Sequence, residues 1–251
     1  MGAFAFKVFM EEILKEHREL LARIDAWFAR SVELHPDKVA CKSGCSACCR
    51  SLFDITLLDA YYLKLGFEDL PAATRETVLH KVRERLCLMR EHWPEFDHPY
   101  LLNYRPDEEW EPLMPEEDES PCVLLGDDGR CLVYQNRPMT CRLHGIPLLD
   151  VDGELMHDDW CTLNFIDEDP FEQPGIEAPF DAMFRQEVAL FREFTGKLLG
   201  RRVSELDTFI PTALLIDFAS FDWRAWLEDF KPAGDAPQPH PRLRVGASDS
   251  P

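Results

Sequence analysis

The stretch Cys41-Lys42-Ser43-Gly44-Cys45-Ser46-Ala47-Cys48-Cys49 places four cysteines in nine residues. Thiolates select zinc ions and iron–sulfur clusters over harder metal ions, and a dense run can supply several ligands from a short piece of backbone. Four of the remaining five cysteines lie further along the chain, at Cys122, Cys131, Cys141 and Cys161. The pattern therefore predicts a soft-metal site built by one dense run and several distant single ligands.

The cysteine content is typical of an intracellular protein. Nine cysteines in 251 residues fall well below the roughly 8–10% that marks a small secreted disulfide scaffold. The N-terminus reaches Glu11 and Glu12 before an export signal develops, and no apolar run approaches the roughly eighteen residues of a membrane span. We therefore expect a cytoplasmic protein with no membrane partner, whose thiols bind metal rather than pair.

The charge of the chain argues against a nucleic-acid partner. It carries 47 acidic and 27 basic side chains, for a formal charge of -20. A phosphate backbone requires clustered Lys and Arg, whereas the most basic stretch, residues 81–90, is interrupted by Glu84 on a helical pattern. The expected partners are a metal ion or cluster and a protein redox partner.

Hydrophobic periodicity predicts a chain made mostly of helices. The first helix spans about residues 7–32 and leads into the cysteine run, and a second follows a capping-box-like Thr56 and stops at Gly66. Further helices are expected at about 71–92, 178–199 and 222–230. Cys87 falls in the third of these helices, far from any other cysteine, and is interpreted as a small core residue outside the site.

One β signal is visible among these helices. Residues 122–125 and 131–134 are short apolar runs on either side of Gly126-Asp127-Asp128-Gly129, which predicts a hairpin with a cysteine on each strand. The expected fold class is mainly α with a small β-hairpin, as an irregular metal-centred α-helical domain. We expect one α-rich domain over residues 1–231 and a disordered tail at 232–251, where Pro, Gly, Ala and Asp dominate.

The spacing of the cysteines favours an iron–sulfur cluster over zinc. Zinc sites usually take two C-x2-C-like pairs, and only Cys45 with Cys48 forms one here. Three clustered cysteines plus a remote fourth are typical of a [4Fe–4S] ligand set, with zinc as the alternative. Adjacent side chains diverge, so Cys48 and Cys49 are unsuited to one mononuclear site. Two centres, or one cluster plus a spare thiol pair, fit the eight cysteines better.

Other polar side chains lie close to these cysteines in the sequence. Guanidinium groups can donate hydrogen bonds to metal-bound sulfur, and the candidates for this are Arg50, Arg137 and Arg142. Imidazoles at His144 and His157 are alternative ligands. An ordinary surface role for the arginines stays open at this level.

The ordered combination of motifs resembles a known family. Cys41-x3-Cys45-x2-Cys48-Cys49-Arg50 is followed by Pro121-Cys122, by Asp128-Gly129-Arg130-Cys131 and by Arg137-Pro138-Met139-Thr140-Cys141-Arg142. This is similar to the YkgJ-type cysteine-cluster family, a zinc- or iron-chelating domain named for its CxxCxxCC signature, over about residues 38–165. Here three residues rather than two separate the first two cysteines. The resemblance implies metal chelation through Cys41, Cys45, Cys48, Cys49, Cys122, Cys131 and Cys141, with Cys161 as an eighth ligand.

The function that follows is a metal-binding, iron–sulfur role in electron transfer, redox sensing or metal handling. A zinc-binding structural module is one alternative. An S-adenosylmethionine-dependent enzyme is another, either a radical enzyme or one like the flagellin lysine N-methylases, whose cysteine cluster is similar. The Cys41-x3-Cys45-x2-Cys48 spacing matches the radical-enzyme cluster loop, but the alternating βα units and the glycine-rich cofactor turn are missing. Whether the chain is an enzyme stays open.

Overall fold

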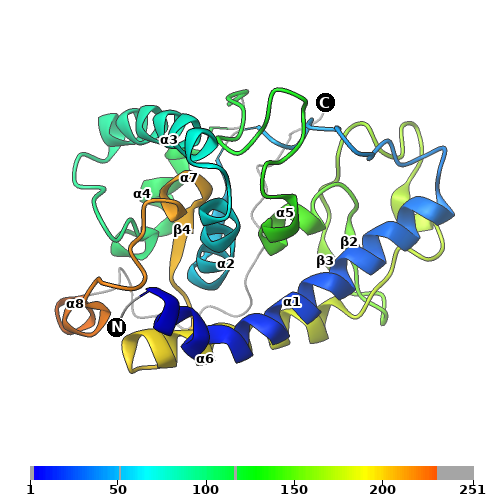
Figure 1. Ribbon diagram of the computed structural model, residues 1–251. Helices are drawn as coiled ribbons and strands as arrows, with labels where there is room; N and C mark the ends of the chain where they lie inside the picture. The colour runs from blue at the N-terminus through cyan, green and yellow to red at the C-terminus, as the bar shows by residue number, and fades with distance from the viewer. Residues whose placement is uncertain (1–2, 51, 116–117, 231–251) are drawn as a thin grey trace.

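The computed structural model describes residues 3–50, 52–115 and 118–230, and helices supply most of their regular structure (Figure 1). The helices are α1 (Ala3–Leu34), α2 (Leu57–Glu68), α3 (Ala72–His92), α4 (Asp107–Trp110), α5 (Met139–Leu143), α6 (Phe180–Leu199), α7 (Ile210–Ala213) and α8 (Trp223–Asp229). The strands are β1 (Asp54–Thr56), β2 (Leu148–Leu149), β3 (Leu155–His157) and β4 (Asp207–Phe209). The predicted mainly α class is thus confirmed, while the tail predicted at 232–251 lies outside the described residues.

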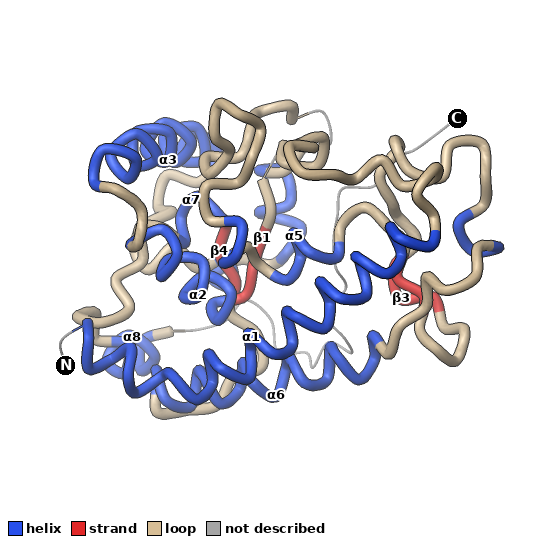
Figure 2. Tube along the Cα trace, turned by 45° about the vertical axis from the view of Figure 1, so that its right-hand side comes forward, coloured by secondary structure: helices blue, strands red, loops and turns tan. Residues whose placement is uncertain are grey.

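The long helix α1 packs along α6, and the two run side by side in both views (Figures 1 and 2). Of the eight apolar side chains whose spacing predicts the buried stripe, seven are at most 2% exposed: Met10, Ile13, Leu14, Leu20, Leu21, Ile24 and Trp27. The eighth, Phe28, is half-buried and packs at the edge of the core. Trp27 also donates its indole N–H to the Ile176 carbonyl oxygen at 2.6 Å. Burial of one helix face therefore anchors the end of α1 that leads into the cysteine run.

Helix α2 begins as the sequence predicts but ends later. The Thr56 hydroxyl accepts a hydrogen bond from the Asp59 backbone N–H at 3.2 Å, which satisfies one free donor of the first turn. The prediction that Gly66 stops the helix is wrong, because the helix continues to Glu68. A Cβ on Gly66 would lie 2.6 Å from the Asn136 side chain, so the glycine makes room for a neighbouring segment instead.

The small β elements join distant parts of the chain. Strands β1 and β4 pair antiparallel, with Asp54 opposite Phe209, and this brings the segment after the cysteine run onto the segment before α7 (Figure 2). Strands β2 and β3 form the small antiparallel hairpin of the fold. Three-residue strands carry too little pattern to be recognised in the sequence.

The hairpin predicted over residues 122–134 is reduced to a turn with one antiparallel bridge, Leu125 to Cys131. The Leu125 N–H bonds to the Cys122 carbonyl oxygen at 2.9 Å, so the first segment curls before it can extend. The Cys122 N–H bonds to the Cys49 carbonyl oxygen at 2.9 Å. Pairing with the cysteine run thus replaces the predicted strand pairing.

The other predicted helices are present as α3, α6 and α8, and Gly200, with φ of +76°, ends α6. The burial predicted for Cys87 is wrong, because its side chain is exposed. The face of α3 that packs inward consists of Val78, Val82, Leu86 and Met89. Cys87 lies one position beyond that stripe, about 100° around the helix, and therefore faces solvent.

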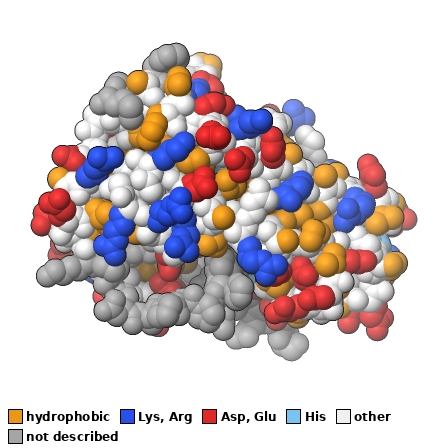
Figure 3. Space-filling view, turned by 90° about the horizontal axis from the view of Figure 1, so that it is seen from below, with side chains coloured by type: hydrophobic (Ala, Val, Ile, Leu, Met, Phe, Trp, Pro, Cys, Tyr) orange, Lys and Arg blue, Asp and Glu red, His pale blue; other side chains and the backbone are white. Residues whose placement is uncertain are grey.

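Charges of both signs are mixed on the face formed by α1 and α6 (Figure 3). Exposed ion pairs on these helices join Arg18 to Glu11 and Arg185 to Asp181. Within the described ranges, no helix combines the length and apolar character that crossing a bilayer would require.

Candidate metal centre

The cysteine run lies on the irregular segment between α1 and β1, on the upper side of the molecule beside the loops that precede α5 (Figure 1). Two consecutive turns fold it, closed by hydrogen bonds from Cys45 N–H to the Lys42 carbonyl and from Cys49 N–H to the Ser46 carbonyl, at 2.9 and 3.0 Å. Gly44 adopts φ of +86° in the first turn. These turns allow four thiols to come from one short segment.

The run is held against the 121–131 segment by backbone contacts. Besides the Cys122 to Cys49 hydrogen bond, Arg50 and Pro121 form an antiparallel bridge. A Cβ on Gly129 would lie 3.1 Å from the Gly44 carbonyl oxygen, and Gly129 itself has φ of +75°. Two glycine turns therefore let the two cysteine-bearing segments approach each other closely.

Mutual electrostatic effects connect Cys41 with Cys45 and Cys161, and connect Cys49, Cys122, Cys131 and Cys141 with one another. Cys48 is connected to both sets, and we group it with Cys41 because it belongs to the same run. We call Cys41, Cys45, Cys48 and Cys161 group 1, and Cys49, Cys122, Cys131 and Cys141 group 2. In group 1, burial raises the pKa of the Cys41 thiol, with further contributions from Cys161 and Cys45 that an Asn164 hydrogen bond partly offsets. Like charges raise each other's pKa only at close range, so these thiols lie together.

The cysteines of group 2 are half-buried, like those of group 1. Burial raises the pKa of Cys122 to about 12, and the neighbouring Cys131 and Cys49 add to the shift. Burial raises the pKa of Cys141 well above its usual value, and Cys122, Cys131 and Cys49 reinforce the effect. A buried thiolate needs a compensating positive charge, which a metal ion supplies.

Cys48 and Cys49 join the two groups through one peptide bond. The Cys48 thiol donates a hydrogen bond to the Cys49 sulfur, which raises the pKa of Cys48 and lowers that of Cys49. Cys48 also feels the charges of Cys141 and Cys41, one from each group. It therefore lies between the groups, whereas Cys49 feels the positive charges of Arg137 and Arg50.

Two arginines next to group 2 are fixed by an acidic residue of α1. Asp25 pairs with Arg137, at 2.9 Å, and with the buried guanidinium of Arg142. Arg142 further donates to the Arg137 and Gln135 carbonyl oxygens at 3.0 and 2.8 Å. The Cys48 hydrogen bond is the main cause of the lowered Cys49 pKa, and the charge of Arg137 lowers it further. Arg137 also lowers the pKa of Cys131, but there the larger effect of burial raises it. These positive charges partly offset the negative charge of four thiolates.

A buried acid on α2 supports the same region. Asp59 accepts from the Met139 N–H at 2.9 Å at the start of α5, the helix that carries Cys141, and pairs with the buried His17 at 2.9 Å. The sequence reasoning missed Asp25 and Asp59, because both lie in helical stripes far from any cysteine in the sequence.

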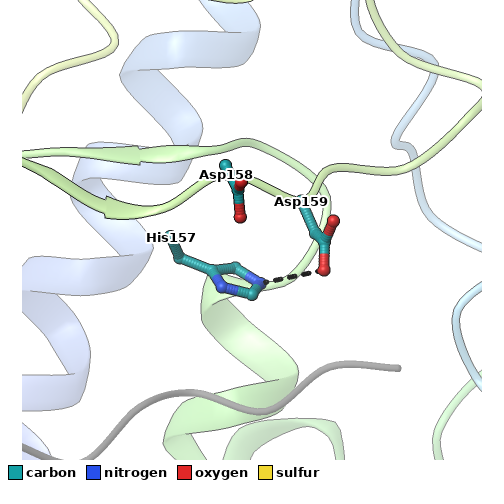
Figure 4. Close-up of side chains that lie close together, drawn as sticks. All are labelled: His157, Asp158 and Asp159. Carbon is teal, nitrogen blue, oxygen red and sulfur yellow. Dashed lines mark ion pairs between the residues drawn. The ribbon is translucent and has the colours of Figure 1, made fainter. Parts of the chain in front are cut away.

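The two histidines considered as alternative ligands lie near each other, and neither contributes to the pKa shifts of the clustered cysteines. The Nε2 atom of His157 lies 3.9 Å from the Asp159 carboxylate, and their ligand atoms and that of Asp158 are within 4.8 Å of one another (Figure 4). His144 packs edge-on against Phe53, and burial lowers its pKa, with a further contribution from His157.

Residues 40–162 match the model of a family named CxxCxxCC and described as a "putative zinc- or iron-chelating domain". This segment is a domain of the CxxCxxCC family. The matched span begins one residue before Cys41 and ends one residue after Cys161, so it contains all eight clustered cysteines. No curated protein and no solved structure matches the chain.

Proposed function

We propose that the two cysteine groups of this CxxCxxCC domain hold two metal centres, and that the centre of group 1 is a [4Fe–4S] cluster. The observation that supports this most directly is that the fold brings eight half-buried cysteines together from the 41–49 run, the 122–141 segment and the Cys161 loop, which is enough for two four-thiolate centres. The assignment of Cys48, which lies between the groups, to group 1 is part of the proposal. An iron–sulfur cluster would supply one-electron redox chemistry, and the role would be electron transfer, redox sensing or metal handling.

The donor set of group 1 favours the cluster. Cys41, Cys45 and Cys48 come from one run and Cys161 from a remote loop, which is the arrangement of three clustered ligands and a distant fourth. Group 2 takes its sulfurs from four separate places in the chain. It suits a closed four-thiolate site, which zinc or a second cluster would fill.

The charges of this chain fit such an occupant. Four thiolates around Zn²⁺, or around a cube at the 2+ level, leave a net negative charge. Arg137 and Arg142 lie beside group 2, and the Asn164 amide faces Cys41 in group 1. The chain's own residues thus provide hydrogen-bond donors and positive charge where thiolates would need them.

Metal analysis of anaerobically purified full chain, combined with visible absorption spectroscopy, tests the proposal. We expect iron and sulfide in stoichiometric amounts and a brown protein. Colourless protein without stoichiometric iron after reconstitution contradicts the iron–sulfur assignment, and absence of zinc as well contradicts metal binding altogether.

A matched pair of substitutions tests the grouping. Cys161→Ala should empty group 1 and leave the metal of group 2 in place, whereas Cys131→Ala should do the reverse. Loss of all metal in both variants would indicate one shared centre, and unchanged metal content in both would contradict the ligand set.

The enzyme alternative has its own test. Anaerobic incubation of the reduced, reconstituted protein with S-adenosylmethionine should give no 5′-deoxyadenosine above that of a Cys45→Ala variant. Its production would favour the radical reaction, which the Cys41-x3-Cys45-x2-Cys48 spacing allows.

A further inference from the structure

The side chain of Asn164 connects three segments at group 1. It is 1% exposed and lies three residues after Cys161. Its Oδ1 accepts from the Ala40 N–H at 2.8 Å, and its Nδ2 donates to the Gly145 carbonyl oxygen at 2.6 Å. The same Nδ2 lies 3.4 Å from the Cys41 sulfur.

The backbone around Asn164 reinforces these contacts. The Asn164 N–H donates to the Cys161 carbonyl at 2.8 Å, and the Cys161 N–H reaches the Gly145 carbonyl at 3.3 Å. Gly145 has φ of +116°, and a Cβ there would lie 3.5 Å from both the Asn164 Nδ2 and the Cys41 sulfur. One amide thus fixes the backbone beside Cys41 and beside Cys161, the two ends of group 1.

An amide is the only side chain of this size that meets all three contacts. It has one acceptor oxygen and two N–H donors, and here the oxygen takes a backbone N–H while the donors serve a carbonyl and a sulfur. Aspartate would face Cys41 with a second negative charge. An apolar residue would leave the Ala40 N–H without its side-chain acceptor and the buried Gly145 carbonyl with only the longer hydrogen bond from the Cys161 N–H.

We propose that Asn164 is a positioning residue of the group 1 centre, which holds the Cys41 sulfur by an N–H···S hydrogen bond and fixes its spacing from Cys161. This inference rests on the proposed function, because it requires that group 1 binds metal. The hydrogen bond stabilises charge on the sulfur, and partners of this kind typically contribute about 10–100-fold to metal affinity.

Two variants and a control separate positioning from ordinary structural support. Asn164→Asp keeps the oxygen that accepts from Ala40 but removes the donor to sulfur, and Asn164→Ala removes all three contacts. Asn103→Ala is the matched control, because Asn103 likewise accepts a backbone N–H, from Asp207 at 2.7 Å, and donates through Nδ2, to the Asp207 carboxylate at 3.2 Å.

The readout is an anaerobic titration of the reduced full chain with Co²⁺, followed by the sulfur-to-cobalt charge-transfer absorption. We expect two equivalents for the wild type and for Asn103→Ala. In both Asn164 variants, one equivalent of Co²⁺ should bind about 10–100-fold more weakly, and the affinity of the second equivalent should stay unchanged. In Asn164→Asp the sulfur-to-cobalt charge-transfer band should also shift. Unchanged affinities and spectra in Asn164→Asp, with lowered thermal stability only, would overturn the inference.

The outcomes also separate this inference from the proposed function. A wild type that takes up neither cobalt nor, on reconstitution, iron and sulfide contradicts metal binding itself, whereas normal uptake by all variants contradicts only the role of Asn164. If the variants fail to fold, ¹⁵N-labelled wild type loaded with ¹¹³Cd²⁺ decides the question. A scalar coupling between cadmium and the Asn164 side-chain amide proton is expected, and an uncoupled amide would overturn the inference.

Discussion

The α1–α6 pair and the cysteine segments are ordered by different forces. In the first, regularly spaced apolar side chains such as Leu14, Leu20 and Ile24 are fully buried between two helices. In the second, turns, single bridges and thiols bring together pieces of chain that contain little regular structure. The comparison teaches that the helices can fold on apolar burial, whereas residues 41–49 have no such core, and we expect their order to depend on a bound metal.

Metal removal should separate the two regions most strongly, because it should unfold the cysteine run and leave the helices folded. Binding of structural zinc supplies about 10–16 kcal/mol in small peptides, and residues 41–49 contain no large apolar side chain that could replace it. The 122–141 segment has some apolar burial of its own, through Val123, Leu124, Val133 and Met139. Chelation should therefore abolish hydrogen-exchange protection over residues 41–49 and lower it over 122–141, while α1 and α6 remain protected. An apoprotein with native protection across both cysteine segments contradicts this account.

A core substitution in α1 should destabilise the α1–α6 pair without affecting metal binding. Leu20 is fully buried in α1, so Leu20→Ala should lower the free energy of unfolding by about 2–5 kcal/mol. Denaturant unfolding measures the loss, and metal analysis of the folded variant should give the wild-type content. Reduced metal content in folded protein would show that the two regions are not separable in this way.

The buried acid Glu187 of α6 makes the helical region sensitive to pH. Burial raises its pKa to about 8, with Asp59 adding to the shift, and its Oε1 has no hydrogen-bond partner in the described structure. The folded state binds this proton more tightly than the unfolded state does, so stability falls as pH rises from the usual carboxyl range toward about 8.

Glu187→Gln should remove that loss. Its gain in stability over the wild type should grow between pH 6 and pH 8, by at most about 1.4 kcal/mol per pH unit. Thermal unfolding at both pH values measures it, with the exposed Glu193→Gln on the same helix as the control. A pH-independent difference would show that Glu187 is already ionised in the folded protein.

Cys87 gives the smallest expected effect. Its exposed thiol lies on α3, and the shifts of the clustered cysteines involve one another but not this residue. Cys87→Ala should leave metal content unchanged and alter stability by no more than about 0.5 kcal/mol. Metal loss in this variant would place the ninth cysteine in the site.

The sequence predicts the parts of this molecule that rest on local periodicity. The stripe of α1, the Thr56 cap and the Gly200 end of α6 are each readable within a few residues. The sequence wrongly predicts a helix stop at Gly66, because the glycine is needed for a close contact with the distant Asn136. It wrongly predicts a full hairpin over 122–134, because the Cys122 backbone pairs with Cys49 instead.

The sequence likewise predicts only part of the candidate site. The eight cysteines are visible as residue types, whereas their grouping depends on how four segments meet in space. Asn164 carried no signal, because a single asparagine near a cysteine is common and its three partners come from separate parts of the chain. Long-range geometry of this kind is not encoded in spacing.

The peptide bond between Cys48 and Cys49 also limits how far apart the two proposed centres can lie. Consecutive Cα atoms are about 3.8 Å apart, so two centres that take these neighbouring cysteines as ligands would be separated by little more than the two side chains. If both groups hold metal as proposed, the site would therefore be a pair of adjacent centres rather than two independent sites.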